Sequence, residues 1–188
     1  SNQSDNPQLI PVQFRVSGMV PQQWNPVTAE RCAIADYKDN GSTTSMTLAL
    51  AGNESAFIVF GKETPQCLPL QLGATPSVLQ MISDPWTVTF QSEMRGPKGK
   101  QAFEQLTSWT ENENDDIRYY SGVATYTNTF KLKTKPTKAT YLDLGKVMVM
   151  ARVYVNDKYA GGVWTPPYRV NVTDLLKKGK NTVRVEVV

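Results

Sequence analysis

The sequence predicts an all-β protein made of a small antiparallel β unit followed by a jelly-roll β-sandwich. Short segments in which apolar and polar residues alternate recur along most of the chain. Turn-forming residues separate these segments at intervals of about 8 to 12 residues, a spacing typical of sandwiches. No segment keeps a helical period for more than about two turns. An interval rich in proline and glycine divides the alternating segments into two groups.

Residues 1–64 are expected to form the small antiparallel unit, as part of a β-sandwich. Alternation predicts strands over residues 9–16, 31–37, 43–50 and 55–60. Asn40 and Gly41 provide the positive φ angles of a hairpin turn, so the second and third segments are expected to pair. The third alternates and should bury one face, whereas the continuous apolar run of the fourth should bury both. About four strands are too few to close a sandwich alone.

Residues 65–77 are expected to be a linker, because prolines and a glycine between Gly61 and Pro85 do not fit regular ladders. The jelly-roll unit should then cover residues 78–188. Its expected strands are residues 86–90, 123–131, 138–144, 147–155, 158–164, 168–172 and 182–188. Asn156 and Asp157 predict a tight turn, and Thr173 should begin a single helical turn that Gly179 ends. Seven or eight strands in about 111 residues fit a β-sandwich or jelly roll.

Composition excludes several classes of function. The 188 residues include 20 basic and 17 acidic side chains, spread along the chain, so nucleic acid is not an expected partner. No apolar run approaches membrane-spanning length, so a membrane is not expected either. Histidine is absent, which excludes Ser-His-Asp and Cys-His catalysis and removes the commonest zinc ligand. The two cysteines, Cys32 and Cys67, are interpreted as small buried apolar side chains, with one disulfide as the alternative in an exported protein.

One acidic segment, residues 111–116, holds four carboxylates among six residues. Paired carboxylates perform glycoside hydrolysis, but they need to face each other across a cleft, and neighbours in one loop do not. A calcium site that uses Asp115 and Asp116 is a second alternative, although the spacing of an EF-hand is missing. A solvated loop is the preferred interpretation, and no other cofactor is expected.

Aromatic residues in loops and at strand ends indicate a carbohydrate contact. Flat rings stack on the C–H face of a pyranose, while their polar atoms bond its hydroxyls. Trp164 and Tyr168 flank two prolines that stiffen the loop, and Trp109 or Tyr120 would assist. The alternative is that Trp164 and Tyr168 anchor the loop against the sandwich or against a neighbouring domain.

From Trp86 onward the chain resembles the galactose-binding-like jelly-roll domain of glycoside hydrolase family 2. It is more similar still to the C-terminal region of bacterial family 106 α-L-rhamnosidase-like proteins. The matching stretches, in family order, are residues 106–109, 120–126, 141–145, 151–156, 162–168, 172–176 and 179–183. Residues 24–26 and 54–60 resemble the β-rich segment that precedes this domain in the rhamnosidase-like proteins.

The resemblance implies a non-catalytic accessory region of a larger glycoside hydrolase acting on plant or microbial polysaccharide, in an exported bacterial protein of the periplasm or the extracellular space. In those families the catalytic carboxylates lie on a separate (β/α) barrel of about 250 residues, so no catalytic residue is assigned here. Carbohydrate and that barrel are the expected partners. The alternative is a purely structural module that braces the barrel without binding sugar.

Overall fold

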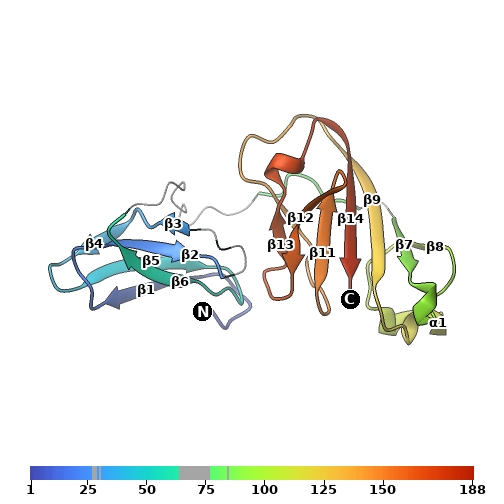
Figure 1. Ribbon diagram of the computed structural model, residues 1–188, viewed down its shortest axis with the longest axis horizontal. Helices are drawn as coiled ribbons and strands as arrows, with labels where there is room; N and C mark the ends of the chain where they lie inside the picture. Colours follow the sequence, from blue (N-terminus) through green and yellow to red (C-terminus); the bar gives the residue numbers. More distant parts are fainter. Residues whose placement is uncertain (27–28, 30, 64–76, 84) are drawn as a thin grey trace. The chain divides into compact units, whose positions relative to one another are not determined.

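The computed structural model describes residues 1–26, 29, 31–63, 77–83 and 85–188. It is nearly all β, with 43% of residues in strands and 8% in helices, so the predicted fold class is confirmed. The chain folds as two compact units, Ser1–Ser77 and Val78–Val188 (Figure 1). The expected linker lies outside the described residues, except for Ser77. No helix in the described part of the chain is long and apolar enough to cross a membrane.

The N-terminal unit contains two three-stranded antiparallel sheets. One has the order β1-β5-β4, with bounds Gln8–Phe14, Thr44–Leu50 and Tyr37–Asp39. The other has the order β3-β2-β6, with bounds Arg31–Ala33, Val20–Trp24 and Phe57–Gly61. The predicted hairpin around Asn40 and Gly41 joins β4 to β5. The segment expected as one strand over residues 31–37 is split, and its first part belongs to the other sheet.

The two sheets of this unit enclose a core of their own. Met46, Leu48 and Leu50 form the predicted buried face of β5. Phe14 of β1 meets Phe60 of β6 edge to face, with 5.3 Å between the ring centroids, and this contact joins the two sheets. Strand β6 is not buried on both faces as expected, because Phe57 is 62% exposed. Six strands, rather than about four, are enough to close a small sandwich.

Cys32 of β3 is disulfide-bonded, so its interpretation as a free apolar side chain is wrong. Cys67 lies outside the described residues.

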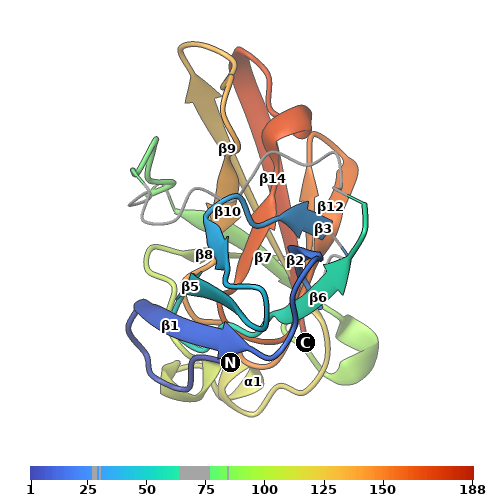
Figure 2. The same ribbon diagram turned by 90° about the vertical axis from the view of Figure 1, so that its left-hand side faces the viewer.

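The C-terminal unit is a sandwich of a six-stranded antiparallel sheet and a two-stranded sheet. The large sheet has the order β12-β11-β14-β9-β7-β8, which Figure 1 shows from its edge strand β12 to its edge strand β8. Their bounds are Lys158–Val163, Ala151–Val155, Gly179–Val187, Ala124–Leu132, Trp86–Phe90 and Lys100–Phe103. The small sheet pairs β10 (Tyr141–Asp143) with β13 (Arg169–Asn171). In Figure 2 the two longest strands, β9 and β14, again run side by side.

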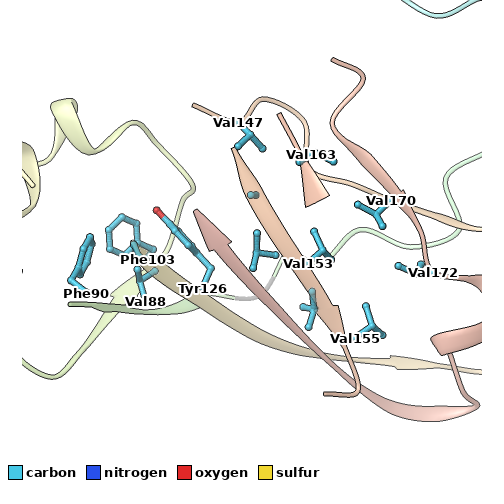
Figure 3. Close-up of a cluster of buried hydrophobic side chains, with 14 of the residues drawn as sticks. Val88, Phe90, Phe103, Tyr126, Val147, Val153, Val155, Val163, Val170 and Val172 are labelled. Carbon is cyan, nitrogen blue, oxygen red and sulfur yellow. The ribbon is translucent and has the colours of Figure 1, made fainter. Parts of the chain in front are cut away.

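One face of the large sheet carries the core of this unit. Val88, Val153 and Val183 point inward from three of its strands and are at most 1% exposed. Figure 3 shows Val170 of β13 and the nearby Val172 beside the valines of β11. Figure 3 also shows aromatic side chains at the other end of the cluster, around β7 and β9. Because alternate residues of a strand point to opposite faces, the neighbours of these valines lie on the outer face of the sheet.

A polar network fixes one end of this sandwich. Asn156 and Asp157 have φ angles of 50° and 64° and form the predicted turn between β11 and β12. The side-chain amide of Asn156 donates to Asn181 Oδ1 and to the Leu175 carbonyl, at 2.9 and 2.8 Å. Leu175 ends the helical turn η3 (Thr173–Leu175), which begins at Thr173 as predicted. Val172 precedes this turn as its N-cap residue, and none of the described side chains caps the turn. Gly179 begins β14 rather than ending the turn.

Candidate functional site

The loop that joins β12 to β13, residues 164–168, presents one of its two aromatic rings to solvent. Val163 is the last residue of β12 and is 4% exposed, whereas Trp164, which follows it, is 55% exposed. The Trp164 ring makes no hydrogen bond or aromatic contact with the described residues. Its indole is therefore free to meet another molecule.

Tyr168 has the opposite role and holds the loop in place. It is partly buried and packs against the core of the sandwich. Its carbonyl accepts a hydrogen bond of 2.8 Å from the Leu144 N–H, which ties the end of the loop to the residue after β10. The amide of Arg169 also donates to the Pro167 carbonyl at 2.9 Å. Of the two aromatic residues predicted in this loop, Tyr168 anchors it and Trp164 is exposed.

Exposed apolar residues gather at the same end of the sheet as Trp164. Ala151 pairs with Val163 and with Val187, so the residues beyond these pairs emerge together at the ends of neighbouring strands. Two hydrogen bonds, Val149 N to Val188 O and Val188 N to Met150 O, extend the ladder at this end. We call the exposed residues here the end patch; they are Met148, Val149, Met150, Trp164 and Val188, between 47% and 71% exposed. The predicted strand over residues 147–155 begins only at Ala151, so residues 147–150 lie before the strand.

Trp109 and Tyr120, the two expected helpers, belong to the core rather than to an open surface. Trp109 begins the short helix η2 (Trp109–Glu111), and its indole N–H donates to the hydroxyl of Tyr126. Its ring meets the rings of Phe90 and Tyr120 edge to face, at 5.8 and 5.5 Å. Tyr120 is 9% exposed, and its hydroxyl donates to the Val123 carbonyl. Burial raises the pKa of Tyr126, and the bond from Trp109 acts in the opposite direction.

The sheet also separates these residues from Trp164. Trp109 contacts residues of β7 and β9, whereas Trp164 follows β12, and β11 and β14 lie between β12 and β9. Three strand steps of about 4.8 Å amount to about 14 Å. A single sugar ring does not span that distance, so the expectation that Trp109 or Tyr120 joins Trp164 in one contact is not supported by their positions.

The acidic segment forms a short helix, α1 (Asp115–Arg118), and the loop before it. Asp115 forms an ion pair with Arg118, and the Asp116 N–H donates to the side chain of Asn114 that caps the helix. Among the described residues, no group of three or more Cys, Asp or Glu side chains is placed to hold a metal ion. The structure thus offers no support for a calcium site at Asp115 and Asp116.

Comparison with known proteins relates most of the C-terminal unit to a known family. Residues 103–188 match the family described as the glycosyl hydrolase 2 galactose-binding domain-like family. This match covers slightly less than half of the 188 residues, and all of it lies in the C-terminal unit. The predicted resemblance to the galactose-binding-like domain of glycoside hydrolase family 2 is therefore confirmed.

Related proteins are much longer than this chain. A Formosa agariphila protein that carries the name of a β-glucuronidase is 39% identical over 110 residues, which are 57% of this chain and 9% of that protein. The rhamnosidase from Novosphingobium sp. PP1Y is structurally similar over 99% of this chain and 18% of its own, with a TM-score of 0.85 and 28% identity. The β-glucuronidase of Ruminococcus gnavus shares the fold over 57% of this chain and 20% of its own, with a TM-score of 0.50 and 20% identity.

Proposed function

We propose that this chain is a non-catalytic accessory region of a longer glycoside hydrolase acting on plant or microbial polysaccharide, and that its loop of residues 164–168 contacts carbohydrate. The exposed ring of Trp164, placed after a buried strand residue by a loop that Tyr168 anchors, carries this proposal. The galactose-binding-like family of the domain and the likeness to a rhamnosidase over nearly the whole chain support it.

The position of Trp164 suits a stacking contact. A fixed loop loses little conformational entropy when it binds, because its backbone is already ordered. Stacking of one ring on the apolar face of a sugar contributes on the order of 1–2 kcal/mol, which is roughly a tenfold change in affinity. Contacts of this kind select a sugar by its shape and not by charge.

The catalytic partner is proposed to be a separate domain of the longer protein. The chain spans 18% of the similar rhamnosidase, and a barrel of about 250 residues does not fit within 188 residues. The end patch favours a second candidate function, in which the same end of the sandwich packs against that domain and braces it without binding sugar. Exposed apolar residues such as Met148 and Val149 are typical of surfaces that a partner covers.

Export to the periplasm or the extracellular space is part of the proposal. The disulfide bond of Cys32 supports it, since disulfides persist in oxidising compartments and are rare in the cytosol.

An NMR titration with methyl α-L-rhamnopyranoside tests the carbohydrate contact. The chain has four tryptophans, and each gives one indole N–H signal in a ¹H–¹⁵N spectrum. Because Trp164 is exposed and the Trp109 N–H is bonded to Tyr126, we expect the Trp164 signal to move and the Trp109 signal to stay. A Trp164→Ala variant should then lose the response of the surrounding loop amides.

A Tyr119→Ala variant is the matched control, since Tyr119 is 76% exposed and lies after α1, away from the loop. It should bind the sugar as the unchanged protein does. If the Trp164 signal does not move at concentrations that would saturate a Kd of about 1 mM, the carbohydrate contact is refuted in favour of the bracing function.

A further inference from the structure

The outer face of the six-stranded sheet carries a second polar and aromatic surface, which the function proposed above does not use. Strand pairing places five side chains in one row across five neighbouring strands. Tyr159 pairs with Tyr154, Tyr154 with Arg184, Arg184 with Thr127, and Thr127 with Thr87. Four strand steps give this row a length of about 19 Å. We call it the cross-strand row.

The row points away from the core. The strand neighbours of Arg184, which are Val183 and Val185, are 1% and 5% exposed and face inward, so Arg184 faces outward. By the same alternation, Tyr154 lies on the outer face of the sheet, while its strand neighbours Val153 and Val155 are buried on the inner face. Tyr159 is 60% exposed at the edge strand β12.

Contacts within the row hold its aromatic end in a fixed shape. The rings of Tyr154 and Tyr159 lie 5.4 Å apart, and the Arg184 guanidinium lies over the Tyr154 ring at 3.7 Å. Arg184 also forms an ion pair with Glu186, two residues along the same strand and on the same face. The guanidinium is therefore held from two sides, and its remaining N–H groups are donors of fixed direction.

The middle of the row lines a depression of about 480 Å³, a size typical of small-ligand sites. Four threonines contribute to its wall, and they are Thr87, Thr127, Thr129 and Thr182. Hydroxyls both donate and accept, as the hydroxyls of a sugar do. The Thr127 hydroxyl already donates to the Thr87 carbonyl at 3.2 Å, which leaves its oxygen free to accept. Arg184 and Asp157 are the charged residues among the described lining, and their formal charges cancel.

We propose that this face is a second carbohydrate-binding site, for a neutral oligosaccharide laid across the strands along the cross-strand row. The tyrosine rings offer stacking surfaces at one end, and the threonine hydroxyls and the fixed guanidinium offer hydrogen bonds over the depression. Because the formal charges of Arg184 and Asp157 cancel, the lining of the depression favours a neutral sugar over a uronic acid. The inference shares the carbohydrate-binding role with the proposed function but rests on other residues, so the two fail independently.

The same NMR titration locates this site by its backbone amides. With methyl α-L-rhamnopyranoside as the probe, we expect shifts in the amides of Thr127, Thr182 and Arg184, and these shifts should persist in Trp164→Ala. Tyr154→Ala should weaken the response at least fivefold, and Arg184→Met, which keeps the stem of the side chain, should weaken it in the same direction. Thr125→Val is the matched control, because Thr125 lies on the same strand and face as Thr127 but outside the depression.

The titration distinguishes between the two proposed carbohydrate sites, the cross-strand row and the Trp164 loop. Shifts confined to the row confirm this site and refute the loop, and shifts confined to the Trp164 loop do the reverse. Absence of shifts at both places refutes both. A stronger response of the row to D-glucuronate than to the neutral sugar refutes the neutral assignment. Equal weakening by Thr125→Val and Tyr154→Ala refutes the row, since a general loss of structure then explains both.

Discussion

Two tryptophans that look alike in the sequence should differ in what their removal costs. Trp109 is partly buried and packs against the core, its ring contacts Phe90 and Tyr120, and its indole N–H donates to Tyr126. An aromatic side chain buries about 200 Å² when fully covered, so three quarters of that at 25 cal/mol/Å² gives about 4 kcal/mol. Trp164 is 55% exposed, and the same arithmetic gives about 2 kcal/mol.

We therefore predict that Trp109→Ala lowers the free energy of unfolding of the C-terminal unit by about 2 kcal/mol more than Trp164→Ala does. For a unit of this size that difference corresponds to about 8 °C in Tm. Native-state hydrogen exchange of the β14 amides is the suitable measurement, because it reports the stability of this unit separately from that of the N-terminal unit. It also does not depend on tryptophan fluorescence, which both substitutions change by removing one of the four tryptophans.

A Tyr119→Ala variant sets the baseline for losing an exposed ring in the same unit. Equal losses of stability in Trp109→Ala and Trp164→Ala would show that Trp164 is a core residue. The proposed carbohydrate contact would then lose the observation that supports it, whatever the binding data show for the outer face.

Three further outcomes follow from buried or bonded polar groups. Asn181→Ala should cost about 3 kcal/mol in urea unfolding, because its fully buried side chain makes several hydrogen bonds worth about 1 kcal/mol each; a loss below about 1 kcal/mol would contradict this. Burial raises the pKa of Tyr126, so the stabilisation by its neutral form is complete below the usual tyrosine pKa of 10.0 and is lost as the pH rises through the raised value. Tyr126→Phe should therefore flatten the alkaline limb of a stability–pH curve, and an unchanged limb would be contrary evidence. Hydrogen bonds from the Gly18 and Gly41 N–H groups lower the pKa of Asp39, so its stabilisation is present above 3.8 and is lost as the pH falls through the lowered value. Asp39→Asn should flatten the acid limb measured by circular dichroism, which an equally steep limb would disprove.

Much of the fold could be predicted because it follows from local patterns. The alternation of Met46, Leu48 and Leu50 predicts one buried face wherever the strand lies in a sheet, and Asn156 and Asp157 tolerate the left-handed conformation of a tight turn. These features depend on a few neighbouring residues. They would be the same in many different sandwiches.

Strand β2 could not be predicted, because its burial depends on partners from distant parts of the chain and not on a local pattern. Its sequence, with Pro21 followed by Gln22 and Gln23, has no apolar alternation, yet all three residues are buried. The Gln22 amide donates to the Glu63 carbonyl, so the partner that permits its burial comes from a distant part of the chain. Sequence periodicity does not report such partners. This unpredicted strand, together with the division of the expected strand 31–37 into β3 and β4, gives the N-terminal unit six strands instead of about four.

The candidate site shows the same division between local and distant causes. Trp164 follows an inward-facing strand residue, so alternation alone directs its ring outward, and its exposure was predictable. The burial of Tyr120 depends on Phe90, which comes from β7, and the anchoring of Tyr168 depends on Leu144 from beyond β10. A flat ring in a loop is thus a weak indicator of binding, because the same ring also closes the end of a sandwich. The stronger indicator is a ring whose own strand position turns it away from the core, and Trp164 meets that criterion.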